Sequence, residues 1–204
     1  MQTNINKIRR EVIRTYKSVD ARLKHVKKAC SAGCAHCCHQ NIPVHAAEEF
    51  AITKYVDNEF SSIQKIELIE RLKNWFQFMN ENTPNISALS EEDVRVFGGK
   101  LIQQKVACPF LSENKCSIYQ VRPITCRTFY VADSPEKCEK NPGRLGEPNG
   151  YKNQVNGIKE IARAADFAQL RLLPYAVAEH FGVMNEIKRG IASEIALSLV
   201  GKHA

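Results

Sequence analysis

The cysteines of this chain are clustered in the sequence. There are eight of them, in two groups: Cys30, Cys34, Cys37 and Cys38, and later Cys108, Cys116, Cys126 and Cys138. Thiolates at such short spacings give a soft or borderline metal several ligands from one segment of chain. We therefore expect the later group to fold back onto the earlier one and close a metal centre.

The expected compartment supports this interpretation. The chain starts MQTNINKIRREVIRTYK, without the uninterrupted apolar stretch of a signal peptide. No run approaches the roughly 18 apolar residues of a membrane helix, so we expect a cytoplasmic protein with no membrane partner. In a reducing cytosol, clustered cysteines bind metal or carry redox chemistry more often than they form structural disulfides. Adjacent Cys37 and Cys38 add to this, because vicinal residues bridge each other only with strain. Metal binding is therefore favoured over disulfides, redox switching and free thiols.

The kind of metal stays open. Eight thiolates fit two closed four-cysteine zinc sites, a bridged dizinc cluster, or one or two iron–sulfur clusters. On a helix, Cys37 and Cys38 would point in directions about 100° apart, so we expect them to serve different ions or to bridge a cluster. His36, His39 and His45 are alternative nitrogen ligands, with exposed or supporting roles as the default.

The periodicity predicts a mainly α protein in one domain, residues 1–204, with a cysteine-rich, loop-dominated metal-binding segment folded onto its helices. Its parts are a basic amphipathic helix (1–29), the cysteine cluster core (30–140) and C-terminal helices (141–204). The first helix, over 4–29, has an apolar stripe that reaches Val26 and, if the helix runs on, continues into Cys30. Gly33 is a candidate helix end, but we expect Cys30 to point inward either way.

Further helices are expected on either side of the loop-rich region. Before that region we expect helices over 46–56 and 62–79, the second capped by Ser61-Ser62, and a third that Ser90 opens and Gly98-Gly99 interrupts or ends. After it we expect a helix from Val155 to near Leu173 and two short helices over 176–181 and 191–200. Between them, residues 106–150 hold four cysteines and scattered Pro and Gly. We expect short turns there, a small ribbon around 117–119 and an exposed loop at 140–152.

The charge is concentrated at one end. The chain carries a net charge of +7, and residues 1–28 supply all of this excess with only Glu11 and Asp20 opposing it. One interpretation is a basic helix that binds nucleic acid or an acidic partner. The favoured one is a solvated helix face, because no aromatic residues accompany the basic ones as single-strand binding would require.

The cysteine pattern also resembles a known family. The matching strings are Cys30-x3-Cys34-x2-Cys37-Cys38-His39-Gln40, Ile42-Pro43-Val44, Glu48, Cys108-Pro-Phe-Leu111, Cys116-Ser-Ile-Tyr-Gln-Val-Arg-Pro123, Cys126-Arg127 and Cys138. Over roughly residues 28–140 the chain is similar to the YkgJ-type CxxCxxCC proteins, a zinc- or iron-chelating cysteine cluster family. The resemblance implies that the eight cysteines bind zinc or an iron–sulfur centre. The first gap differs, with three residues between Cys30 and Cys34 where many members have two.

The residues around the cysteines allow an enzyme as the alternative. A flagellin lysine N-methylase is similar in its cysteine cluster, but no methyl-donor signature accompanies it here. A metal-dependent enzyme would need an open coordination position and a general base, for which Glu48, Glu49 and Asp133 are candidates; helix-capping or surface roles suit these residues better.

Two arginines flank Cys126. We expect Arg122 and Arg127 to lie beside the cofactor, offset the thiolate charge and donate hydrogen bonds to sulfur. The alternative role for both is to brace the loop by bonding carbonyl groups.

Overall fold

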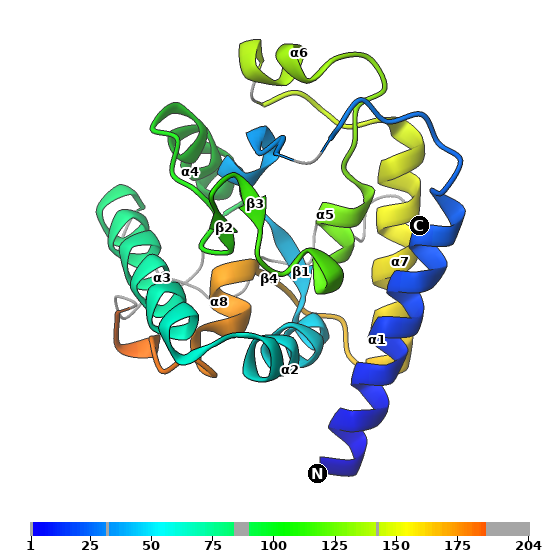
Figure 1. Cartoon of the computed structure of the whole chain (residues 1–204), viewed down its shortest axis with the longest axis vertical. Coiled ribbons are helices and arrows are strands. Elements are labelled where there is room, and N and C mark those ends of the chain that lie inside the picture. The colour runs from blue at the N-terminus through cyan, green and yellow to red at the C-terminus, as the bar shows by residue number, and fades with distance from the viewer. Residues whose placement is uncertain (1, 32, 84–89, 142, 187–204) are drawn as a thin grey trace.

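A computed structural model describes residues 2–31, 33–83, 90–141 and 143–186 (Figure 1). The helices are α1 (Gln2–Arg22), α2 (Glu49–Glu59), α3 (Ser62–Asn82), α4 (Glu91–Gln103), α5 (Ile124–Thr128), α6 (Pro135–Lys140), α7 (Pro148–Ala165) and α8 (Leu173–Ala178). Short 3₁₀ turns are η1 (His36–His39), η2 (Ala46–Glu48), η3 (Tyr119–Val121) and η4 (Met184–Glu186). The strands are β1 (Pro43–His45), β2 (Leu111–Ser112), β3 (Lys115–Cys116) and β4 (Leu170–Leu172). The helix expected at 191–200 lies outside the described residues.

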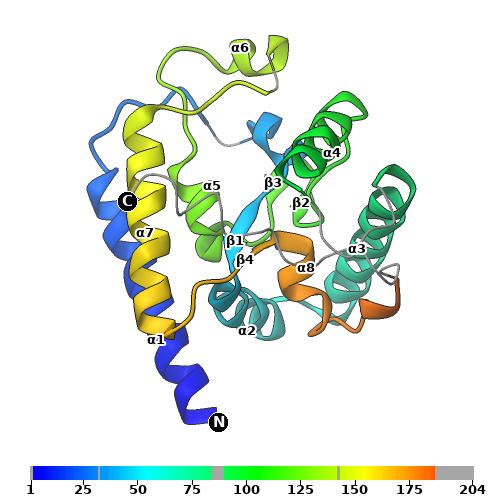
Figure 2. The same cartoon turned by 180° about the vertical axis from the view of Figure 1, so that it is seen from behind.

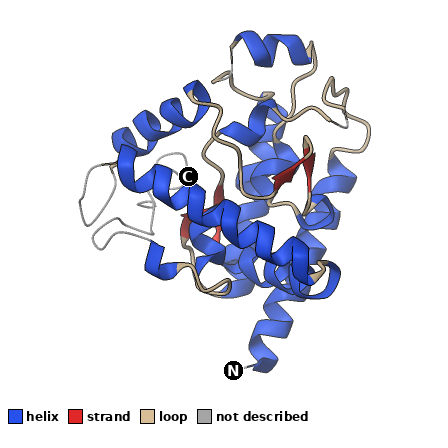
Figure 3. Cartoon of the chain, turned by 60° about the vertical axis from the view of Figure 1, so that its left-hand side comes forward, coloured by secondary structure: helices blue, strands red, loops and turns tan. Residues whose placement is uncertain are grey.

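The prediction of a mainly α fold is confirmed. Figure 3 shows helices throughout, with the strands confined to small ribbons. One ribbon pairs β1 with β4 antiparallel, with Val44 opposite Arg171, and the other pairs β2 with β3. The β1–β4 ribbon lies between the α1–α7 helix pair on one side and α8 with α3 on the other (Figures 1 and 2). Within the described residues, none of the helices has both the length and the apolar character needed to cross a bilayer.

The first helix is shorter than its periodicity predicts. Its stripe from Ile8 to Leu23 is buried against the core, as expected of an amphipathic helix. The helix ends at Arg22, however, and the backbone N–H of Ala29 donates to the carbonyl of Val131 over 2.8 Å. Residues after α1 therefore pair with the chain that leads into α6. The expected helix over 4–29 was too long, and the expectation that Cys30 points inward was wrong, because Cys30 is exposed.

Serine caps begin α3 and α4 as predicted. Ser61 and Ser90 each accept the N–H of the third residue of the helix, and that residue's side chain returns a bond to the serine N–H. Gly98-Gly99 does not interrupt or end α4. A Cβ atom at Gly98 would lie 2.9 Å from the side-chain nitrogen of Asn41, so glycine there permits close packing of α4 on the segment after η1.

The C-terminal part also differs from the periodicity in places. Helix α7 begins at Pro148, inside the stretch expected to be an exposed loop, because Gly150 lets it pack directly on α5. A Cβ at Gly150 would lie 2.2 Å from the carbonyl oxygen of Thr128. Helix α7 ends at a left-handed Asp166 rather than near Leu173, and Leu170–Leu172 becomes a strand because β1 offers it backbone partners. The ribbon expected around 117–119 forms slightly earlier, at β2 and β3.

A buried carboxylate joins three of these elements. Glu48, which is fully buried, accepts bonds from the Tyr16 hydroxyl of α1 (3.0 Å), the His45 backbone N–H (2.8 Å) and the Ile124 N–H of α5 (2.8 Å). Burial raises the pKa of this carboxyl, and the Ile124, His45 and Tyr16 donors counter that rise. The carboxylate thus fixes α1 and α5 on the turn that precedes α2.

His45 is part of the same support. Its Nδ1 accepts the N–H of Ala47 (3.2 Å), which leaves Nε2 to donate to the carbonyl of Phe167 (2.9 Å). Burial lowers the pKa of the imidazole, which favours this neutral form. Both ring nitrogens of His45 are thus engaged in holding the fold.

The carboxylate network predicts the effect of replacing Glu48. Glu48→Gln sets an amide N–H₂ group against backbone N–H donors, so we expect the free energy of unfolding to fall by about 1–3 kcal/mol. Urea denaturation measures the change. The matched control is Glu70→Gln at an exposed position of α3. It loses only a surface ion pair with Lys73 and should change the free energy of unfolding by less than about 0.5 kcal/mol. Equal stabilities of the two variants would contradict a supporting role for Glu48.

Candidate metal centre

The charge effects on the pKa values of the thiols divide the eight cysteines into two groups, which differ from the two groups in the sequence. The inner group consists of Cys37, Cys38, Cys108, Cys116 and Cys126, whose thiolate charges act on one another. The outer group consists of Cys30, Cys34 and Cys138, because the charge of Cys30 raises the pKa of Cys34 and the charges of Cys30 and Cys34 raise that of Cys138. Cys34 also feels the charge of Cys37, so the two groups adjoin at that point.

Separate segments bring the inner thiols together. Turn η1 carries Cys37 and Cys38, and the N–H of Cys108 donates to the carbonyl of Cys38 over 2.7 Å. The β2–β3 ribbon pairs Cys116 with Leu111, three residues after Cys108, and the short helix α5 carries Cys126. The later segment therefore folds back onto the earlier one, as the sequence predicts.

Four of the five inner thiols have raised pKa values, and Cys37 is the exception. Burial, together with the charges of neighbouring thiolates, raises the pKa of Cys108 to about 12 and that of Cys126 well above its usual value. The Cys38 thiol hydrogen-bonds to the sulfur of Cys37, which lowers the pKa of Cys37 to about 7 and raises that of Cys38. Charge on one sulfur thus disfavours charge on the others, an effect that a bound metal cation would reverse.

Backbone donors point at several sulfurs. The N–H groups of Phe110, Ile118 and His36 hydrogen-bond to Cys108, Cys116 and Cys34, in each case from two residues further along the chain. Hydrogen bonds of this kind favour the thiolate over the thiol and oppose the effect of burial. The local backbone is thus arranged to receive negative sulfur.

The two arginines beside Cys126 have different surroundings. Arg127 donates from Nε to the carbonyl of Arg122 (2.7 Å), from Nη1 to Asp20 Oδ2 (2.6 Å) and from Nη2 to the carbonyl of Gln120. Its guanidinium also lies 4.2 Å from the ring centroid of Tyr16. Arg127 therefore braces the loop before α5 against α1, which is the second of the two roles expected for it.

Arg122 faces the inner group. It stacks over the Tyr119 ring at 4.0 Å, and its buried Nε has no hydrogen-bond partner among the described residues. Burial raises the pKa values of Cys116 and Cys126, and the positive charge of Arg122 opposes that rise at both. The positive charge of Arg122 thus offsets thiolate charge at Cys116 and Cys126, and its role beside a cofactor stays a prediction.

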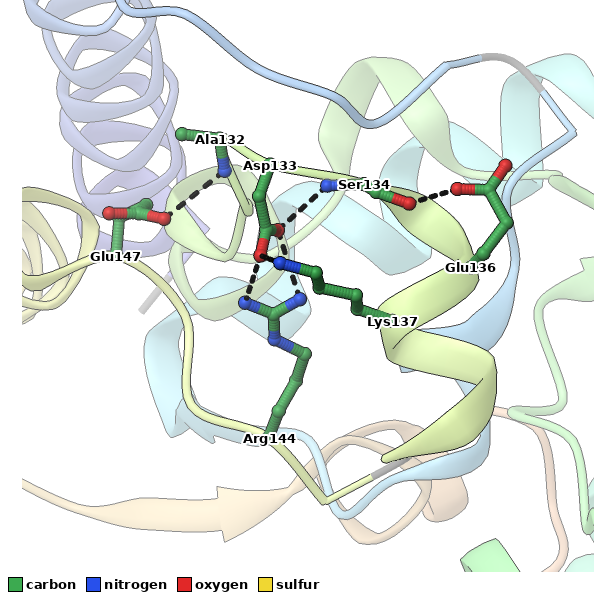
Figure 4. A network of polar contacts seen from close by, with 7 residues as sticks. All are labelled: Ala132, Asp133, Ser134, Glu136, Lys137, Arg144 and Glu147. Carbon is green, nitrogen blue, oxygen red and sulfur yellow. Dashed lines mark hydrogen bonds and ion pairs between the residues drawn. The ribbon is translucent and has the colours of Figure 1, made fainter.

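The outer group lies near the surface at one end of the molecule. Cys30 is exposed, Cys34 is half-buried before η1, and Cys138 on α6 is buried. Burial raises the pKa of Cys138, whereas the Arg144 guanidinium, which also hydrogen-bonds to this sulfur, lowers it. Arg144 is in turn held by Asp133, with bonds of 3.0 and 3.1 Å (Figure 4).

The candidate general bases have other partners. Glu48 is enclosed by the donors described above, and Asp133 binds Arg144 and Lys137. The Arg144, Ser134 and Lys137 donors hold the pKa of Asp133 well below its usual range. Burial raises the pKa of Glu49, which lies at the start of α2 near Arg171. His36 and His39 are half-buried on η1, and His36 lies near Glu136.

The sulfur atoms do not form a complete metal-coordination sphere. As the described His, Cys, Asp and Glu side chains stand, no three of them are arranged to hold a metal ion. Each cysteine has one side-chain torsion with three staggered positions, so a sulfur can turn toward a shared ion without movement of the backbone. The inner donors are all sulfur, a set that suits zinc or an iron–sulfur centre and not magnesium or calcium.

Comparison with known proteins agrees with this donor set. The family model CxxCxxCC, described as "Putative zinc- or iron-chelating domain", matches residues 29–144. That range includes all eight cysteines and both arginines, and it covers more than half of the chain. The chain matches none of the curated proteins and none of the solved structures with which it was compared. It belongs to the CxxCxxCC family of zinc- or iron-chelating domains.

Proposed function

We propose that this protein binds zinc or an iron–sulfur centre through its eight-cysteine cluster, with the inner group as the principal site. The proposal rests on the packing of the segments that carry five of the cysteines: the Cys108 N–H bonds to the Cys38 carbonyl over 2.7 Å, and Cys116 pairs with Leu111, three residues after Cys108. The charges of the neighbouring thiolates also raise the pKa values of Cys38, Cys116 and Cys126. Without a cation, these thiols either ionise and repel one another or stay protonated. A bound metal cation neutralises the thiolate charge and so favours the ionised form.

The centre is of the closed kind. The inner group has more sulfurs than the four that a zinc ion needs, and Glu48 and Asp133 are engaged elsewhere. Zinc would supply cross-linking between the loop-rich segment and the helices, and an iron–sulfur cluster would supply electron storage. A structural or electron-storing centre therefore fits better than the enzyme alternative, which needs an open position with a free base.

The basic residues at the N-terminus fit a solvated face. Of those between Lys7 and Lys28, all but Arg9 are exposed, and they lie opposite the buried stripe of α1 or just beyond the helix. Arg14 pairs with Glu11 (2.9 Å), Arg22 pairs with Glu160 (2.8 Å), and Lys28 lies 5.6 Å from the Tyr130 ring centroid. Three of the basic side chains therefore already have partners within the protein. This favours a solvated helix face over a surface that binds nucleic acid.

Metal content tests the proposal directly. Protein purified without oxygen should contain zinc, or iron with acid-labile sulfide. Elemental analysis and the visible spectrum distinguish them, because zinc protein is colourless and an iron–sulfur protein is brown with broad absorption. Eight freely titratable thiols and no metal after anaerobic purification would contradict the proposal.

Cysteine substitutions should have unequal effects. Cys126→Ser and Cys37→Ser should lose metal and lower the free energy of unfolding by more than about 4 kcal/mol, because loss of a metal site is among the most destabilising changes. Cys30→Ser should be milder, since Cys30 is exposed and lies outside the inner group. Metal analysis and thermal denaturation of the three variants measure this. Equal losses in all three would make Cys30 a full ligand of the same centre.

Replacement of Arg122 tests the charge argument. Arg122→Gln keeps every thiol but removes the positive charge beside Cys116 and Cys126, so metal affinity should fall by about 10- to 100-fold. Competition with a chromogenic chelator measures the affinity. The control is Arg22→Gln, which removes an equal charge from the surface pair with Glu160 and should leave the affinity unchanged. A similar loss in both variants would show that only the net charge matters.

A further inference from the structure

We propose that a small pocket between α7 and the β1–β4 ribbon binds a compact organic carboxylate, with the apolar body of the ligand inside and its carboxylate at the rim. The pocket has a volume of about 190 Å³, and none of its described lining residues is a cysteine. It lies beside the end of α7 that leads toward β4, which points away from α6 in Figures 1 and 2. The inference is therefore independent of the metal centre.

The end of the ribbon forms the inner part of the pocket. His45 of β1 lies opposite Leu170 of β4, and both residues are buried. The imidazole nitrogens of His45 are already bonded to the Ala47 N–H and to the Phe167 carbonyl, at 3.2 and 2.9 Å. His45 therefore presents ring carbon to the pocket rather than a free polar group, and the inner surface is apolar.

Helix α7 supplies one wall with two different rows of side chains. Ile158 and Ala162 lie one helical turn apart, and Lys159 and Arg163 form the adjacent row. Ile158 is buried and Ala162 half-buried, whereas Lys159 is half-buried and Arg163 exposed. The apolar row therefore continues the inner surface of the pocket, and the cationic row lies at its rim.

The charges at the rim favour an anion. Among the described residues, neither the Lys159 nor the Arg163 side chain has an ion-pair or hydrogen-bond partner, whereas Glu160 between them pairs with Arg22 over 2.8 Å. None of the described lining residues is acidic. Side chains four residues apart on a helix start about 5–6 Å from each other, so one carboxylate can reach both cations.

The volume of the pocket limits the size of the ligand. An apolar cavity of about 150 Å³ accommodates a benzene ring, whereas pockets for drug-sized molecules have about 300–1,000 Å³. At about 190 Å³, this pocket fits one aromatic ring or a short branched alkyl group. An apolar interior of that size with two cations at its rim matches a small aromatic or aliphatic monocarboxylate.

Matched probes test which parts of such a ligand are recognised. Full-length protein is titrated with phenylacetate, and binding is followed by backbone amide chemical shifts. We expect saturable shifts at residues 158–163 and 168–170 and at His45. We expect weaker binding of 2-phenylethanol, which keeps the ring without the charge, and no saturation by acetate, which keeps the charge without the ring. Equal affinities for phenylacetate and 2-phenylethanol, or shifts that do not saturate or lie elsewhere, would overturn the inference.

Variants of the lining residues test the two rows separately. Ala162→Leu fills the pocket with a side chain that suits a helix, so binding of both aromatic probes should be lost. Lys159→Gln and Arg163→Gln leave the apolar surface intact. Each should weaken phenylacetate binding by about 2- to 5-fold, the effect of one exposed ion pair, and should leave 2-phenylethanol binding unchanged.

The control variant is Lys152→Gln, which removes an exposed charge from α7 outside the pocket and should leave both affinities unchanged. Circular dichroism checks that each variant is folded, and the two charge variants keep the test decisive if Ala162→Leu folds poorly. Undiminished binding in folded Ala162→Leu, or an equal loss in Lys152→Gln and Arg163→Gln, would contradict the site. Metal content should be the same in all of these variants, so the outcome is separate from that of the proposed function.

Discussion

The placement of Cys126 depends on the buried carboxylate of Glu48. It binds the Tyr16 hydroxyl of α1, the backbone of the turn before α2 and the first N–H of α5, and so fixes the helix that carries Cys126. Arg127 reinforces the same junction through Asp20 and two loop carbonyls. A buried carboxylate is tolerated because backbone and hydroxyl donors replace the water it loses. This rigid frame brings the inner sulfurs together although burial opposes their ionisation.

The inner group therefore combines opposing effects. Burial and mutual repulsion favour protonated thiols, whereas backbone N–H donors and Arg122 favour thiolates. A cation that binds sulfur resolves this conflict, and membership of a zinc- or iron-chelating family gives independent support. In the outer group Cys30 remains in contact with solvent, whereas Cys138 is buried.

Features set by local chemistry could be predicted from the sequence. The buried stripe of α1 and the serine caps of α3 and α4 follow from residue spacing alone, as does the mainly α class. The division of the cysteines could not be predicted, because it depends on α6 and α5 reaching different parts of the Cys30–Cys38 stretch. Helix α1 ends at Arg22, and Gly33, with a positive φ of 87°, turns the chain between Cys30 and Cys37. Likewise, the close contacts of Gly98 and Gly150 exist only once distant segments meet.

X-ray absorption at the metal edge of the anaerobically purified protein identifies the atoms bonded to the metal. A centre held by these cysteines should give coordination dominated by sulfur, at about 2.3 Å if the metal is zinc. Coordination dominated by nitrogen or oxygen would contradict it, because the inner group offers only sulfur and the nearby carboxylates of Glu48 and Asp133 are held by other residues.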